Sequence, residues 1–462
     1  PQSAFAKKTR RFFIMQNNKL GTMPMGKLLA NMSGPIILSM VIQALYNIVD
    51  SMFVARYSEV ALNAVSLCYP IQMIMVSLSV GGAISVQALL ARFLGSKEFD
   101  KANSVATHGL LMALFHASLF ILFGIFCSKQ FLLLFSNDME IIGEGISYMQ
   151  ICTIFGFGIF VQIVYERFMQ ATGNAIYNMI IQGAGALLNI ILDPIFIFGL
   201  CGLPEMGIRG AAIATVLGQL LSTALGVYIT RHKVKEIHTD FKHFRFDASL
   251  VREMYKIAIP SMLMNSIMSI MTVFMNMILS GFSALSVSVY SIYFKLQQFL
   301  YMAVSGMSNA VIAIISYNYG ARNKERIKSC IRISLISTII IMASGTVIFQ
   351  LFPVQLLSLF NASEEMLSIG IPALKTISLS FIFGGVNVQG CAILQSLDSS
   401  KESLVVTLLR QFIIILPLAF ALSKMFGLNY VWFAFPVSEL VALVLCIRFL
   451  KEVDKDFIEK LN

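Results

Sequence analysis

The chain has 462 residues, of which 57% are hydrophobic and only 13% are charged, and its mean hydropathy is +0.79. An ordinary globular protein carries about 25% charged residues, so this composition excludes soluble, disordered and disulfide-stapled secreted proteins and predicts an integral membrane protein. The seven cysteines have no CxxC spacing, and we assign the net charge of +10 to membrane topology rather than to nucleic-acid binding.

Apolar windows of about 20 residues, the length needed to cross a bilayer, predict twelve transmembrane helices joined mostly by short loops. In chain order the windows cover residues 31–54, 61–91, 104–127, 145–165, 178–199, 209–230, 257–280, 286–316, 331–352, 368–394, 404–424 and 431–449. The predicted fold class is therefore an all-α integral membrane bundle.

The positions of the 34 Lys and Arg residues predict the orientation. With both termini cytoplasmic, only four of these cations fall in loops on the opposite side, namely Arg56, Lys129, Arg209 and Lys424. Cationic loops resist translocation, so we expect a multi-pass protein of the plasma membrane, in a bacterium the inner membrane, with cytoplasmic ends.

The two halves of the chain align with each other at one constant shift. Aligned pairs include Pro35 with Pro260, Gln72 with Gln297, Gly81 with Gly306 and Gln170 with Gln395, and the basic loop 95–101 aligns with 320–326. Six helices per half is an even number, so both halves run the same way and are related by an axis along the membrane normal. Two such repeats around a central cavity are typical of transporters.

The repeat predicts the domain organisation. We expect a cytoplasmic N-terminal segment, an N-terminal six-helix lobe, a cytoplasmic linker, a C-terminal six-helix lobe and a cytoplasmic tail, at residues 1–30, 31–230, 231–256, 257–450 and 451–462.

The polar centre of the predicted spans exists only in the first half. Asp50 aligns with Met275, and Asp193 aligns with Leu418. An ionisable residue near the bilayer centre costs about 2.5 to 3.5 kcal/mol on insertion scales, and a purely structural role would not require it in one repeat alone. We therefore predict a functional role for both aspartates; the alternative is a buried polar tie between helices.

Helical spacing places these acids on polar faces. Those faces consist of Gln43, Tyr46, Asn47 and Asp50 in the first span and of Gln182, Asn189 and Asp193 in the fifth. Pro194 also leaves the carbonyl of Ile190 without its usual donor. Carboxylate, amide and carbonyl oxygens suit a hard cation, either Na⁺ or a proton; the alternative is a proline kink without an ion.

Several segments resemble the multidrug and toxic compound extrusion (MATE) transporters. They are QALYNIVDSMFVAR, ARFLGSKEFDKA, ERFMQATGN, NIILDPIFIFG and GIRGAAIATVLGQ, and the resemblance extends from about residue 24 to 450. It implies a V-shaped pair of six-helix bundles that alternates between outward-open and inward-open states. Such transporters expel lipophilic cationic small molecules in exchange for H⁺ or Na⁺, so we expect no cofactor besides the coupling ion and a monomer surrounded by membrane lipids.

The resemblance also implies the ion-coupling residues. Asp50 matches the family's first-helix aspartate, Asn189 and Asp193 match its NxxxD pair, and Thr215 matches a sixth-helix threonine that completes a cation site. These four residues would be metal ligands if the ion is Na⁺.

The remaining polar residues of the spans either are candidates for lining the substrate cavity or help to set the membrane topology. The candidates are Gln43, Tyr46, Asn47, Gln182 and Lys295. Lys295 could be displaced by a cationic substrate, interact with Glu439, or anchor the second lobe. For Arg410 we expect a side chain that reaches out to the membrane surface, and for Glu166 a topological role at a cytoplasmic helix end.

Two other functions are alternatives to a MATE transporter. A flippase for a lipid-linked or amphipathic metabolite is the alternative within the same superfamily, although it would favour a cationic cavity. An enzyme is not expected, because the sequence contains no HExxH, GxSxG or Walker A motif, and no catalytic residue is assigned.

Overall fold

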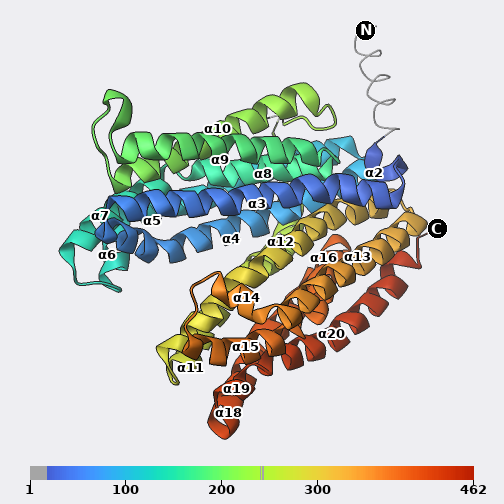
Figure 1. Ribbon diagram of the computed structural model, residues 1–462. Coiled ribbons are helices and arrows are strands. Elements are labelled where there is room, and N and C mark those ends of the chain that lie inside the picture. Colours follow the sequence, from blue (N-terminus) through green and yellow to red (C-terminus); the bar gives the residue numbers. More distant parts are fainter. Residues whose placement is uncertain (1–17, 240, 242–243, 462) are drawn as a thin grey trace. The chain divides into compact units, whose positions relative to one another are not determined.

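The computed structural model describes residues 18–239, 241 and 244–461, and this part of the chain consists of helices with no strand (Figure 1). Ten of its helical segments are long and apolar enough to cross a membrane. They are α3 (Met25–Tyr57), α4 (Glu59–Gly95), α5 (Phe99–Phe126), α9 (Ala175–Ile197), α10 (Ile208–Lys233), α11 (Ala248–Ser280), α12 (Ala284–Gly320), α13 (Lys324–Leu351), Ser400–Phe426 and Leu428–Ile458. Short helices α2 (Lys19–Thr22), α6 (Ser128–Leu133), α14 (Pro353–Ser358) and η1 (Leu200–Gly202) lie between spans or before the first.

The last two of these spans are composite. Ser400–Phe426 contains α17 (Ser400–Leu408), a π-helical turn η2 (Leu409–Ile413) and α18 (Ile415–Phe426). Leu428–Ile458 contains α19 (Leu428–Val431), α20 (Ala434–Val453) and η3 (Asp454–Ile458).

Two further spans are bent. Helix α7 (Met139–Ile154) meets α8 (Phe157–Ala171) at 43°, and α15 (Glu364–Ser378) meets α16 (Phe381–Ser396) at 47°. If each pair counts as one crossing, the described chain has twelve, and the prediction of a twelve-helix membrane fold is confirmed. Hydrophobicity alone could not reveal the bends, because each pair is apolar enough across its break to read as one span. At the first bend Gly156 is required, since a Cβ there would lie 2.2 Å from the carbonyl oxygen of Cys152.

The internal repeat is visible in the backbone. Ser58 and Ser283, which align with each other in the repeat, cap α4 and α12 with their hydroxyl oxygens. Lys97 and Arg322, which align at the same shift, both have left-handed φ angles, of 64° and 55°. Residues with a Cβ rarely adopt this conformation, so its recurrence in the same register reflects a common backbone rather than shared hydrophobicity.

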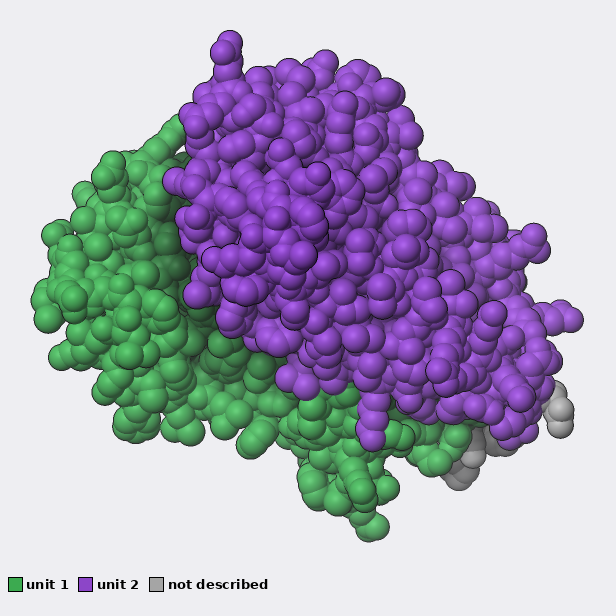
Figure 2. Space-filling view, turned by 90° about the horizontal axis from the view of Figure 1, so that it is seen from below, with its two compact units in different colours: residues 1–22, 34–262 green, residues 23–33, 263–462 purple. Residues whose placement is uncertain are grey.

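The described chain forms two compact units, which Figure 2 distinguishes by colour. Of the described residues, unit 1 takes in 18–22 and those between 34 and 262, and unit 2 takes in 23–33 and 263–461. The boundaries therefore fall inside α3 and α11, so the first turns of each of these helices belong to a different unit from the rest.

Within unit 1, the segment between α10 and α11 is held by helix α5. The side-chain oxygen of Asn103 accepts a hydrogen bond from the backbone N–H of His238 at 2.8 Å. His108 Nε2 accepts one from the backbone N–H of Asp247 at 3.1 Å, and Asp247 in turn caps the first turn of α11.

Candidate functional site

Helices α9 and α10 of unit 1 approach each other closely at two glycines. A Cβ on Gly218 would lie 2.7 Å from the carbonyl oxygen of Gly185, and a Cβ on Gly185 would lie 2.0 Å from Ser222 Oγ. Small residues allow such backbone contact between membrane helices. The contact brings the polar face of α9 within hydrogen-bonding distance of α10.

Asn189, Asp193 and Thr215 form a cluster at this contact. Asn189 Nδ2 donates to Asp193 Oδ1 at 3.3 Å and to Thr215 Oγ1 at 3.4 Å. Asp193 is 0% exposed and Asn189 is 2% exposed, whereas Thr215 is partly exposed. Three of the four residues expected to bind the ion are thus in mutual contact.

Asp50 on α3 is the fourth member. Its carboxyl group faces that of Asp193 closely enough for a hydrogen bond when one of the two is protonated. Two ionised carboxylates at this separation repel each other. The pair therefore requires a proton or another cation to relieve the repulsion.

Several oxygens of this site lack a donor. Asp50 Oδ1, Asn189 Oδ1 and Asp193 Oδ2 are buried and have no hydrogen-bond partner among the described residues. A buried acceptor without a donor is costly, and one cation would satisfy several at once. Carboxylate, amide and hydroxyl oxygens of this kind suit a hard cation such as Na⁺, or a proton.

The substrate-cavity candidates differ in their placement. Gln182 Nε2 donates to Gln43 Oε1 at 2.7 Å, which joins α9 to α3. Tyr46 lies within electrostatic range of both Asp50 and Asp193. Asn47 is exposed on α3, and Lys295 is exposed on α12 of unit 2.

Comparison with known proteins gives the family. The family model MatE matches residues 35–195 and 260–421, two segments that begin at the aligned prolines of the repeat and together cover more than half of the chain. The chain belongs to the MATE family. The family is one of transporters rather than enzymes, and the first matched segment contains Asp50, Asn189 and Asp193, whereas Thr215 lies outside both.

Curated MATE relatives match over nearly their whole length. "Multidrug export protein MepA" of Staphylococcus saprophyticus is 24% identical over 430 residues, which are 92% of this chain and 94% of the relative. The protein of the same name from Staphylococcus haemolyticus is 23% identical and covers 91% and 92% of the two chains.

Solved MATE structures share the fold. The outward-facing conformation of a multidrug resistance MATE family transporter has a TM-score of 0.87 at 22% identity and covers 95% of this chain and 98% of its own. A MATE structure in the bent conformation has a TM-score of 0.86 at 23% identity, with coverages of 93% and 96%. The predicted MATE fold is confirmed.

A chain of hydrogen-bonded polar side chains inside the N-terminal unit is not predicted by the sequence pattern. Asn178 Nδ2 donates to Ser39 Oγ at 3.0 Å, and Gln170 Nε2 donates to Asn178 Oδ1 at 3.2 Å. Arg167 Nη1 donates to Gln170 Oε1 at 2.8 Å and to Gln87 Oε1 at 3.1 Å. Glu166 beside it is buried and accepts a bond from Gln162, so its assignment to a topological role at a helix end is wrong. The sequence signal for this polar chain was the row of polar residues on one face of the fifth span, which continues from Asn189 to Asn178.

A buried ion pair in unit 2 was also missed. Arg410 Nη1 and Glu439 Oε1 are 2.6 Å apart, with side chains 8% and 13% exposed, and Asn387 Nδ2 donates to Glu439 Oε2 at 2.8 Å. Arg410 therefore does not reach the membrane surface as expected, because the carboxylate of Glu439 neutralises it inside the unit. This pairing also replaces the contact between Lys295 and Glu439 that was one of the sequence alternatives.

Proposed function

We propose that this chain is a cation-coupled multidrug efflux antiporter that exports lipophilic, mostly cationic small molecules in exchange for H⁺ or Na⁺. One observation carries the proposal: the paired carboxyl groups of Asp50 and Asp193 lie beside buried oxygens without donors. Membership of the MATE family and the names of its export relatives support the substrate class.

The mechanism is a competition for negative charge. An incoming cation neutralises Asp50 and Asp193, which removes the repulsion between them and lowers the affinity for a bound cationic compound. Release of the ion restores the charge and favours loading of the next compound. Ion and substrate must stabilise different conformations for this exchange to be driven by a gradient, since a ligand shifts an equilibrium only by its differential affinity.

The topology belongs to the same proposal. We assign both termini and the segment 231–256 to the cytoplasm, because most Lys and Arg residues lie on that side and few lie on the other. A monomer is sufficient for the mechanism, since all four ion-coupling residues come from one unit.

The test is efflux of a fluorescent lipophilic cation from proteoliposomes, with a Na⁺ gradient and a pH gradient imposed separately. We expect a response to one gradient that Asp50→Asn abolishes and that Asp100→Asn, at an exposed position of α5, retains. Normal coupled efflux by folded Asp50→Asn protein contradicts the proposed site. No response of the unmodified protein to either gradient would favour the flippase alternative.

A further inference from the structure

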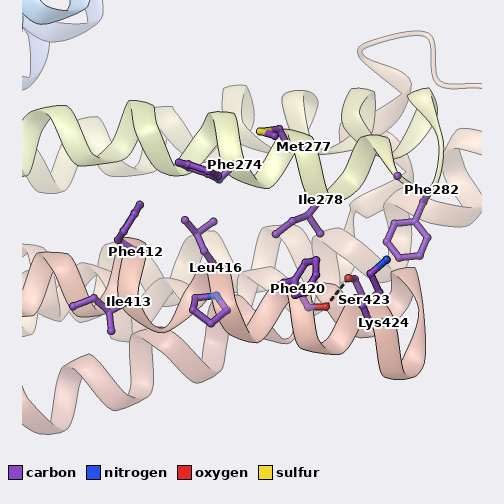
Figure 3. A pocket seen from close by; sticks show the side chains of 12 residues that line it. Phe274, Met277, Ile278, Phe282, Phe412, Ile413, Leu416, Phe420, Ser423 and Lys424 are labelled. Carbon is purple, nitrogen blue, oxygen red and sulfur yellow. Dashed lines mark hydrogen bonds between the residues drawn. The ribbon is translucent and has the colours of Figure 1, made fainter.

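Unit 2 contains an apolar pocket of about 850 Å³ between α11 and the segment formed by η2 and α18 (Figure 3). Phe274 and Met277 face it from α11, and Leu416 and Phe420 face it from α18. Its volume falls in the range of about 300 to 1,000 Å³ that is typical of small-molecule sites. Aromatic rings and a methionine give such a site large, adaptable contact area.

The pocket lies on the helices that correspond, in the repeat, to α3 and α9 of unit 1. Phe274 and Met277 flank Met275, which aligns with Asp50, and Leu416 and Phe420 flank Leu418, which aligns with Asp193. Met275 is fully buried and neither it nor Leu418 lines the pocket, so the pocket lies on a different face of these helices from the residues that align with the carboxyl pair. The two repeats carry different side chains on these helices, although their sequences still align at the same shift.

One end of the pocket is polar. Of the twelve described residues that line it, Lys424 alone is charged, and it stands beside Phe282 and Ser423 at one end (Figure 3). Its Nζ lies 5.7 Å from the centroid of the Phe420 ring, and the side chain is exposed. The ammonium group can therefore meet a ligand at the mouth while the rings hold an apolar body.

We propose that this pocket binds the aromatic body of an amphipathic carboxylate, with the carboxylate placed on Lys424. The assignment rests on the proposed export function and adds anionic or zwitterionic aromatic compounds to its substrates. A simple cation is disfavoured at this end, because Lys424 repels it. Rigid rings also lose less conformational entropy in the pocket than a flexible lipid chain does, which favours a small aromatic ligand over a phospholipid.

The single tryptophan of the chain provides the readout. Trp432 is fully buried in unit 2, so energy transfer from its emission to a dansyl group reports ligand close to this unit. Dansylglycine and dansylcadaverine share one fluorophore but carry opposite charges. Both are titrated into protein in nanodiscs of zwitterionic lipid, with empty nanodiscs as the baseline.

We expect saturable transfer to dansylglycine and weak transfer to dansylcadaverine. Lys424→Gln should weaken dansylglycine binding about fivefold, the size of one exposed charge-assisted contact. Lys424→Glu should reverse the preference between the probes, and Leu416→Phe, which fills the pocket, should weaken both. Lys129→Gln, at an exposed lysine of unit 1, is the matched control and should change nothing.

Equal transfer to both probes, or dansylglycine binding unaffected by the Lys424 and Leu416 substitutions, overturns the assignment. Displacement of dansylglycine by phosphatidylglycerol but not by phosphatidylcholine would identify a lipid as the occupant and would also overturn it. The assay uses no gradient and reads ligand binding in unit 2 directly, whereas ion coupling is read by gradient-driven efflux. Failure of ion coupling and failure of this pocket assignment are therefore distinguishable.

Discussion

At the residue scale, the ability of the ion site to bind a cation depends on single polar atoms. Asn189 uses one amide group to contact Asp193 and Thr215, while its own oxygen lacks a donor. The orientation of Asn189 thus fixes one oxygen of Asp193 and leaves acceptors available on both side chains. The amide positions the carboxylate rather than neutralising it.

Asn189→Ile introduces the residue that the second repeat carries at Ile414. We expect gradient-driven efflux to fall at least tenfold, because Asp193 loses its donor and the site loses an acceptor. Thr215→Val should have a smaller effect, since it removes only the 3.4 Å contact. The measurement is the ion concentration that gives half-maximal efflux, which should rise in both variants; an unchanged value in Asn189→Ile would contradict this role.

The ion pair between Arg410 and Glu439 leads to a second prediction at the residue scale. Arg410→Met should destabilise unit 2 by about 3 to 5 kcal/mol, because Glu439 is left as a buried, uncompensated charge. The double variant Arg410→Met with Glu439→Leu should recover most of this loss, because no buried charge remains. Thermal unfolding followed by Trp432 emission measures both, and a single variant as stable as the unmodified protein would show that the charge is not buried.

Sequence reasoning found the aspartates but not this ion pair, for a physical reason. The aspartates stand out because each aligns with an apolar residue in the other repeat. Arg410 lies on the π-helical turn η2, which adds a residue to the turn and changes the direction of the side chains that follow. Helical periodicity therefore cannot show that Arg410 faces Glu439.

At the scale of elements, the contact between α9 and α10 holds the ion site together. Gly218→Val should force these helices apart, since even a Cβ would lie 2.7 Å from the Gly185 carbonyl oxygen. We expect a loss of about 1 to 3 kcal/mol in stability together with weaker ion coupling, because the Asn189–Thr215 contact depends on the same approach.

The matched control for that substitution is Gly143→Ala. Gly143 is exposed on α7 and a Cβ there meets no atom within 4 Å, so a small gain in stability, about 0.5 to 1 kcal/mol, is expected. Size-exclusion profiles after heating compare the two variants. Equal melting of Gly218→Val and the unmodified protein would refute the tight contact.

Ion pairs connect the C-terminal residues to α13. Glu459 lies 2.5 Å from the Nζ of Lys324 and also pairs with Lys328, and these hydrogen bonds lower the pKa of Glu459 to about 2. A lowered pKa in the folded state means that the tie is fully present above the ordinary carboxyl pKa and is lost as the pH falls toward 2. Because Glu459 is exposed, high salt should also weaken the tie.

Glu459→Gln should release this end of the chain. We expect faster trypsin cleavage after Lys455 and Lys460 at neutral pH, and the unmodified protein should approach that rate at high salt. Glu452→Gln is the control, because Glu452 pairs with Arg448 of the same helix and ties nothing to α13. Equal cleavage of the two variants would mean that the Lys324 and Lys328 contacts do not hold the end.

The elements differ in how well sequence predicts them. All twelve crossings were expected, because a bilayer imposes a minimum length on each apolar segment. The bends between α7 and α8 and between α15 and α16 were not, because they depend on close backbone contacts such as that of Gly156. Membrane hydrophobicity determines where helices occur, whereas their breaks are determined by packing.

At the scale of the whole molecule, duplication explains what could be predicted. One constant shift along the sequence relates the helix caps, the left-handed positions and the starts of the family matches in the two halves. The carboxyl site was therefore predictable as the departure from this symmetry. The pocket of unit 2 was not, because an apolar residue that lines a cavity has the same sequence signature as one that faces lipid.

The division of α3 between units has a consequence for biosynthesis. Residues 23–33 belong to unit 2, where Arg326 Nη2 donates to the carbonyl oxygen of Met23 at 2.8 Å. At a translation rate of about 5 to 20 residues per second, the first turns of α3 leave the ribosome roughly 15 to 60 seconds before Arg326 is made. Unit 1 can begin to fold in that interval, but the earliest part of α3 must wait for a partner from the second half. Residues 23–33 are thus synthesised early and packed late.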